Sequence, residues 1–300
     1  MTSRLKENQR FQPDYGKRWS STSFFKDPPE YWKEQGVQHL GCRHKAKQVK
    51  DKDGHITTTH TSDMTKYMEN LCKGFEEKFG IKLKAASTPF IDQIGMKKIA
   101  EKDEPEARFG QFAASPRMAG LYGARSCRPD LNVAISRMAR RITRWTRIDD
   151  DRLLRLLGYI SSHTNLGLTS TLSTKDHDEA VLRLWPDADL AGDPTEDSRS
   201  SSGEFVELAS VDGKRCWPLH WSYAKQTFTA GHTQEAEIAS MYSTIWDNGF
   251  PLASLLEFLL GRPVTIEVFE DNAAAITLAK AGFPGRLRHF TRPKRIHIDI

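Results

Sequence analysis

Three acidic residues in the second half of the chain stand at positions where acids in proteins often do chemistry. Asp187 ends the strand-like run VLRLWPD, and Asp271 ends the run VTIEVFED, directly before a helix that starts at about Asn272. Glu237 lies in the first turns of the helix-like segment TQEAEIASMYSTIW, beside an apolar stripe. Because α/β folds gather reactive groups at their strand ends, these three side chains could face one another.

Three converging carboxylates would repel each other unless divalent cations neutralised them. Hard oxygen ligands select Mg²⁺ or Mn²⁺, and such a cluster has the outline of a two-metal site for cleaving phosphodiester bonds. Taken singly, Asp187, Glu237 and Asp271 are each better explained as a helix cap or a solvated terminus, so the pattern has to be judged jointly.

The elements that must position these acids alternate between strand-like and helix-like patterns. The runs AVLRLW, GEFVELA and CWPLHWSYAK alternate like strands, a helix follows from about Thr233, and PVTIEVF leads into the helical NAAAITLAKAG. Strands followed by helix, strand and helix describe an α/β domain, which we assign to residues 178–300.

The first half of the chain is organised differently. Residues 1–36 form an irregular arm, and Asp53-Gly54 predicts the tight turn of a β-hairpin. An amphipathic helix follows, with Ser62 or Asp63 as its cap and Gly80 as its end. Residues 92–115 read as a connecting segment, and residues 116–172 as a small helical module.

The distribution of charge indicates a function less strongly than the three acids do. Between Arg117 and Arg155 there are ten arginines and no lysine, although the net charge is only +5. Arginine suits phosphate contacts, and a solvated helix face explains such a run equally well. The candidate nucleic-acid contacts are Arg137, Arg140, Arg141 and Arg144.

The four cysteines are scattered, which fits reduced thiols in an intracellular protein of the cytoplasm and/or nucleus. No apolar run reaches the roughly 18 residues of a membrane span, so we expect no membrane partner.

Four blocks of the second half resemble, in order, the ribonuclease H region of copia-type retrotransposon Pol polyproteins. PDADLAGDPTEDSRSSSGEF resembles the family's first strand and turn, and AKQTFTAGHTQEAEIAS its Lys-Lys-Gln to Glu-Ala-Glu-Tyr block. FEDNAAAITLAKAG resembles Cys-Asp-Asn-Gln-Ser-Ala-Ile, and RHFTRPKRIHIDI resembles Arg-Thr-Lys-His-Ile-Asp-Ile. Pro186, Leu190 and Ile238 depart from the family's pattern, but none of them replaces an acid.

The resemblance implies a ribonuclease H-like mixed sheet with flanking helices, cut short at its C-terminal end. It makes Asp187, Glu237 and Asp271 the catalytic, metal-binding acids, with two Mg²⁺ ions (Mn²⁺ possible) as cofactors and an RNA/DNA hybrid as substrate. The family's fourth acid lies past the end of this sequence, which leaves Asp299 as the fallback. The neighbouring acids Asp189, Asp193 and Glu235 are not expected to take part.

The upstream modules resemble the same polyproteins. Residues 37–91 are similar to the end of a reverse transcriptase palm with the start of its thumb, and residues 116–172 to a thumb and connection module. The aromatic-x-Asp-Asp turn of the polymerase site is missing, and the acids of Asp149–Asp151 read as a helix cap. The remainder of the Pol polyprotein is therefore an expected partner.

The resemblance thus predicts a polyprotein fragment that hydrolyses the RNA of RNA/DNA hybrids by two-metal catalysis and has no polymerase site. A catalytically inactive nucleic-acid-binding remnant of a retroelement is the competing hypothesis. An unrelated scaffold protein that keeps the fold is a third.

Overall fold

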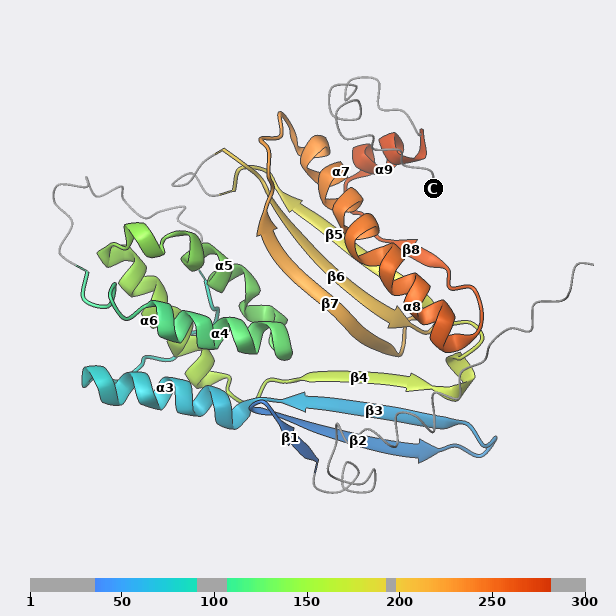
Figure 1. Cartoon of the computed structure of the whole chain (residues 1–300), viewed down its shortest axis with the longest axis horizontal. Helices are drawn as coiled ribbons and strands as arrows, with labels where there is room; N and C mark the ends of the chain where they lie inside the picture. The colour runs from blue at the N-terminus through green and yellow to red at the C-terminus, as the bar shows by residue number, and fades with distance from the viewer. Residues whose placement is uncertain (1–35, 91–106, 193–197, 282–300) are drawn as a thin grey trace, which may run out of the picture.

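The computed structural model describes residues 36–90, 107–192 and 198–281 (Figure 1). The expected N-terminal arm, most of the connecting segment, and the acids Asp193 and Asp299 lie outside these residues. The described chain is mixed α/β with two four-stranded sheets. Within it, no helix combines the length and the apolar character that a membrane crossing requires.

The first sheet is antiparallel, in the order β1-β2-β3-β4. Its strands are β1 (Val37–His39), β2 (Cys42–Lys50), β3 (Ile56–Asp63) and β4 (Leu168–Ser173). The predicted hairpin is confirmed, because β2 pairs with β3 around a turn in which Gly54 has a φ of 90°. β4 was not expected: residues at the end of the predicted helical module extend and pair with β3.

Helices pack together at one end of this sheet (Figure 1). They are α3 (Thr65–Phe79), α4 (Ala114–Ser126), α5 (Asn132–Arg140) and α6 (Arg147–Ser162). The predicted amphipathic helix is α3. It ends at Gly80, whose left-handed φ of 61° lets its N–H bond the carbonyl of Glu76. The start of α3 differs slightly from the predicted one. Ser62 lies in β3, and the side chain of Asp63, the last residue of β3, accepts a hydrogen bond from the Thr65 N–H.

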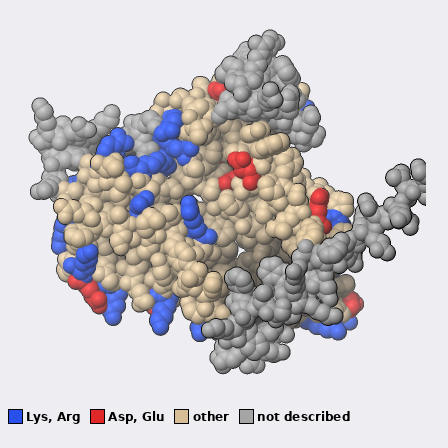
Figure 2. Space-filling view, in the orientation of Figure 1, with Lys and Arg blue, Asp and Glu red and all other residues tan. Residues whose placement is uncertain are grey.

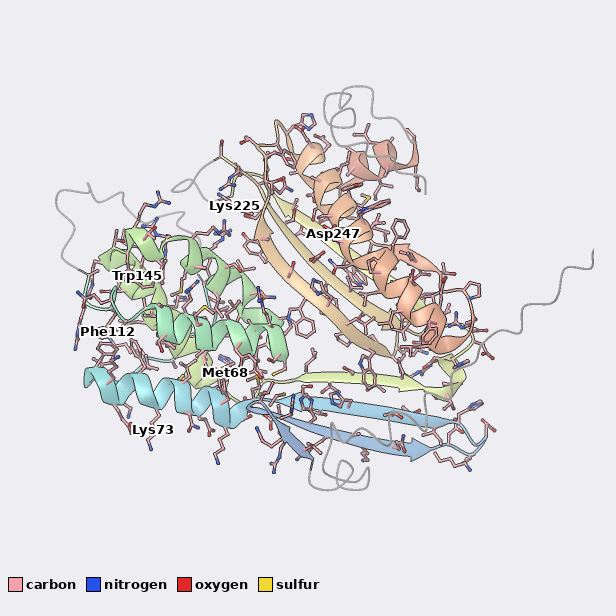
Figure 3. All side chains as sticks on the ribbon, viewed as in Figure 1. Met68, Lys73, Phe112, Trp145, Lys225 and Asp247 are labelled. Carbon is pink, nitrogen blue, oxygen red and sulfur yellow. The ribbon has the colours of Figure 1, made fainter. Side chains whose placement is uncertain are left out.

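The apolar stripe of α3 faces the core shared by these helices. Met68, Cys72 and Phe75 are buried there (Figure 3 labels Met68). Phe109 joins the same core at 2% exposure, although the sequence leaves it in a connecting segment. Phe109 stacks edge-on against Phe75, and such a contact between distant residues leaves no periodic trace in the sequence.

The second sheet is mixed and has the order β7-β6-β5-β8. Its strands are β5 (Val181–Asp189), β6 (Ser201–Ala209), β7 (Cys216–Lys225) and β8 (Ile266–Val268). Three consecutive strands pair antiparallel, whereas β8 pairs parallel to β5. A parallel neighbour needs a crossover connection, and the intervening helices supply it.

These helices lie on one face of the second sheet (Figure 1). They are α7 (Thr233–Ser243), α8 (Phe250–Leu260) and, after β8, α9 (Ala273–Lys280). A π-helical segment, Thr244–Gly249, joins α7 to α8. Leu182 and Leu184 of β5 pack against Leu256 of α8, so alternate side chains of β5 form the core while the others face away from it.

The two halves of the chain contact each other through α5 and β4, which both lie against β7. The indole Nε1 of Trp221 donates to the carbonyl oxygen of Ala124 at 2.7 Å. The ring of Trp217 stacks on His60 of the first sheet, with the ring centroids 5.6 Å apart. The helical module therefore holds the sheet that carries the predicted acids.

Candidate metal centre

The acids Asp187, Glu237 and Asp271 meet at one end of the second sheet. Each offers a carboxylate oxygen, and these three oxygens all lie within 4.8 Å of one another. Asp187 and Asp271 are exposed, whereas only 4% of Glu237 is exposed. The structure therefore brings together the three residues that the sequence singled out, while their chemical roles remain predictions.

Asp187 is held by the interior strand of the sheet. β5 has β6 on one side and β8 on the other. The hydroxyl of Ser240 donates to the Asp187 carbonyl oxygen at 2.8 Å, which ties α7 to this end of β5. The backbone at Asp187 is thus held by its pairing with Gly203 of β6 and by the Ser240 hydroxyl.

Glu237 is placed by the way α7 begins. The Nδ1 atom of His232 accepts the Glu235 N–H at 3.3 Å, and the Glu235 carboxylate accepts the Gly231 N–H at 2.7 Å. Glu235 therefore serves the helix start and is not in the acidic group, as expected. Glu237 lies two residues on, on another side of the helix, where it meets the end of β5.

Asp271 is placed by the junction between β8 and α9. The Phe269 N–H donates to the Leu184 carbonyl oxygen at 2.8 Å, so the chain stays beside β5 past the end of β8. Asn272 then caps α9, and its Oδ1 accepts the N–H groups of Ala274 and Ala275 at 3.0 Å each. Asp271 is thereby left facing the sheet end between a strand and a capped helix.

The environment of Glu237 opposes its negative charge. Burial raises the pKa of Glu237 to about 7, and the charges of Glu270, Asp187 and Asp271 act in the same direction. The backbone N–H of Ala188 hydrogen-bonds this carboxylate and acts against the shift. Oε2 of Glu237 is buried without a hydrogen-bond partner.

Glu270 also contributes its charge to this acidic group, and it is not among the residues predicted from the sequence. Burial raises the pKa of Glu270. A hydrogen bond from the Asn272 N–H lowers this pKa, whereas the charges of Asp271 and Asp187 raise it further. The sequence contains a signal that could have identified Glu270: this residue stands where the family's block has a cysteine, which places two acids in a row before the helix. A second acid beside Asp271 could have been noted on that ground.

The donor set fits a divalent cation. Carboxylate oxygens are the ligands that Mg²⁺ and Mn²⁺ prefer. A buried carboxylate oxygen without a partner, as at Glu237, is costly unless a proton or a cation satisfies it. Asp187, Glu237 and Asp271 would hold the ion.

Asp189 lies just past Asp187 and does something else. Its carboxylate pairs with the Arg137 guanidinium at 3.0 Å, between the end of β5 and α5. This ion pair joins the helical module to the strand that carries Asp187. Asp189 is outside the acidic group, as the sequence analysis expected.

The four candidate nucleic-acid contacts have different surroundings. Arg137 is paired with Asp189, and Arg141 donates from Nε to the buried Asp149 at 2.6 Å. Arg140 lies over the ring of Tyr223 at 5.7 Å and donates to its own helix, whereas Arg144 is exposed. Lys and Arg side chains are numerous over the helical half of the face in Figure 2. Arg144 is the best placed of the four to contact phosphate.

A second polar group lies between the sheet and the π-helical segment, in a hollow of about 580 Å³ whose lining includes Lys225 and Asp247 (Figure 3). Glu204 accepts hydrogen bonds there from His220 at 3.1 Å, Ser222 at 2.6 Å and Asn248 at 2.9 Å. Burial opposes its charge, yet these donors hold the pKa of Glu204 below its ordinary value. Unlike Glu237, this acid is fully provided with partners.

Comparisons with known proteins find similarity to polyproteins of transposons. No family model matches the chain. It is similar to two Arabidopsis thaliana proteins, the retrovirus-related Pol polyproteins from transposon RE1 (31% identical over 166 residues) and transposon RE2 (28% identical over 163 residues). Each match covers 54% of this chain and 10% of the relative, so the chain spans a small part of the curated proteins it matches.

Proposed function

From the relationship of this chain to copia-type retrotransposon Pol polyproteins, we propose that its second sheet and α7–α9 form a ribonuclease H-like nuclease domain. The domain would hydrolyse the RNA strand of RNA/DNA hybrids. The observation that carries the proposal is the meeting of Asp187, Glu237 and Asp271, whose oxygens lie within 4.8 Å of one another.

The order of the elements supports this fold assignment. Three antiparallel strands are followed by the helices α7 and α8, a parallel strand beside the first of the three strands, and the helix α9. The acids stand at the end of the first strand, in the first turns of α7 and after the parallel strand. This is the order in which the resembling blocks occur in the sequence.

Contacts within the chain fix the positions of these acids. β5 and the Ser240 hydroxyl hold the backbone at Asp187, and burial keeps water from one oxygen of Glu237. Bound divalent cations would supply activation of a water molecule and stabilisation of the leaving 3′ oxygen. The chain would contribute three carboxylates that already lie close together, which limits the rearrangement that ion binding requires.

Substrate recognition would rest on the helical half. Arg144 is exposed on the basic helical module and can contact phosphate groups, while the 2′-hydroxyl distinguishes RNA from DNA. The Arg137–Asp189 ion pair would keep this module in register with the acidic group. The remainder of a Pol polyprotein is the expected partner.

The test is cleavage of a labelled RNA/DNA hybrid by the full chain in Mg²⁺. Asp187→Asn should lower the rate by more than about 100-fold, since even residues that merely orient metal ligands contribute 10- to 100-fold. Asp151→Asn is the matched control, because Asp151 is exposed at the start of α6. Cleavage that survives Asp187→Asn would contradict the proposal, and hybrid binding without any cleavage would favour the inactive remnant.

A further inference from the structure

A groove of about 430 Å³ lies between α6 and the segment that follows α3, in the helical half of the chain. Apolar side chains form part of its lining. The charged part of the lining consists of five basic residues and one acid: Lys82, Lys84, Arg108, Arg147, Arg155 and Asp151. The groove shares no residue with the candidate metal centre, so the proposed nuclease function does not account for it.

Contacts with two helices fix the segment that carries the lysines. Lys82 and Lys84 are exposed, whereas Leu83 between them packs against the helical core. The Leu83 N–H donates to the Glu76 carboxylate of α3 at 2.8 Å. The Lys84 carbonyl lies against Gly158 of α6, where a Cβ atom would come within 2.0 Å of its oxygen. The backbone at both lysines is therefore held in place, and only their side chains need to be ordered by a ligand.

The helix α6 contributes two arginines to the groove. Arg147, Asp151 and Arg155 follow one another at intervals of four residues, so their side chains share one face of the helix. Nη2 of Arg155 donates to the Thr88 hydroxyl at 2.7 Å, while Nε of the same guanidinium is buried and has no acceptor. A buried donor without a partner is costly, and an oxygen of a bound anion would supply the acceptor that Arg155 lacks.

The positive charge of the groove exceeds what its acid can balance. Asp151 pairs with Arg147 at 3.6 Å. Within residues 36–90, 107–192 and 198–281, no carboxylate lies within ion-pair distance of Lys82, Lys84 or Arg155. Like charges gathered in a concave site concentrate ions of the opposite sign. The groove is therefore suited to a ligand that carries several negative charges.

We propose that this groove binds a triphosphate anion the size of a nucleotide. Arginine and lysine are the side chains that bind phosphate groups most strongly, and the volume falls within the range of about 300–1,000 Å³ typical of small-molecule pockets. A triphosphate concentrates its charges at one place, whereas a peptide or a nucleic-acid strand spreads one charge over each residue or nucleotide. The apolar side chains of Ile81 and Leu154, which also line the groove, can contact a base.

The test is a calorimetric titration of the full chain with ATP in EDTA, because chelation prevents a metal ion from joining the nucleotide to the acidic centre. The wild type should bind one ATP, and the double variant Lys82→Gln/Lys84→Gln should weaken this affinity by at least about tenfold. The matched control, Lys45→Gln/Lys47→Gln, removes two exposed lysines with the same spacing from β2, outside the groove. Because salt screens distant charges, the control should change the affinity by less than about twofold. Absence of saturable binding by the wild type, or equal losses in the two double variants, would overturn the inference.

Two further measurements test the chemistry of recognition. Arg155→Gln should weaken ATP binding more than Arg155→Lys, because lysine keeps the charge but not the planar fork. Thermal denaturation checks that both variants are folded, and equal affinity of both with the wild type would speak against a role for Arg155.

Competition experiments identify the group that the groove recognises. Inorganic triphosphate should displace ATP if the phosphates are bound. An oligonucleotide without terminal phosphates that displaces ATP equally well would overturn the inference in favour of a nucleic-acid surface. Since no divalent cation is present in these assays, their outcome is independent of the proposed nuclease function.

Discussion

Two groups of buried acids in this protein have opposite surroundings. At the start of α6, Asp149 and Asp150 are 0% exposed, yet both oxygens of each carboxylate accept hydrogen bonds. At the end of β5, Glu237 is 4% exposed, and one of its oxygens has no partner. Burial alone therefore does not distinguish a structural acid from a candidate metal ligand.

The donors around α6 explain the difference. Asp149 accepts from Arg141, Arg152 and the Thr146 cap, and Asp150 accepts from Trp145 and the backbone of Phe109. These contacts join the helix start to the core, as the predicted capping role requires. In the second group the neighbours of Glu237 are other acids, so its charge has to be neutralised by a proton or by a bound cation.

The largest effect should come from removing a structural acid. Asp149→Ala removes the buried carboxylate that Arg141 and Arg152 both bind and should lower the free energy of unfolding by about 3–5 kcal/mol. Urea denaturation measures it. The control, Asp151→Ala, removes an exposed ion pair and should lower the free energy of unfolding by about 0–1 kcal/mol. Equal losses from the two substitutions would show that the buried acid is no more important for stability than the exposed one.

Removing the charge of Glu237 should instead raise the free energy of unfolding. Its pKa is raised from 4.5 to about 7 in the folded protein, so without cations the protein loses stability as pH rises from about 4.5 to about 7. Glu237→Gln should abolish this loss and gain up to about 3 kcal/mol above pH 7. Urea denaturation in a chelator at pH 5 and pH 8 checks this, and a pH-dependence that persists in Glu237→Gln speaks against it.

Divalent cations should stabilise the wild type by a smaller amount. Mg²⁺ at ten times its dissociation constant adds about 1.4 kcal/mol if it binds only the folded chain. Thermal denaturation with and without Mg²⁺ measures the gain. Asp271→Asn should remove it, whereas Asp149→Asn should keep it; a gain that Asp271→Asn leaves intact would place the ion elsewhere.

The smallest effect concerns the arginines. Arg144→Ala should weaken hybrid binding and reduce the salt dependence of the affinity by about one unit of slope, because Arg144 is exposed. Arg141→Ala should instead destabilise the fold, since Arg141 pairs with buried Asp149. Affinity measured across a salt series, with urea denaturation alongside, separates the two; equal losses of affinity would show that both contact phosphate.

Several features followed from local sequence patterns. The hairpin turn at Gly54, the end of α3 at Gly80 and the cap formed by Asp149 each depend on a few neighbouring residues, and all three are present in the structure. The strand-like runs that precede Asp187 and Asp271 predicted that each of these acids lies at the end of a strand. The resemblance to Pol polyproteins then joined these acids to Glu237.

Other features depend on contacts between distant residues, and only the tertiary structure decided them. β4 pairs with β3 across more than a hundred residues of sequence, and Arg137 pairs with Asp189 across the junction of the two halves. Glu270 reads in the sequence as one more acid before a helix, and the structure shows that its Oε2 atom is buried without a hydrogen-bond partner. Local patterns position a residue along its element, but packing determines which charges face each other and which are left without partners.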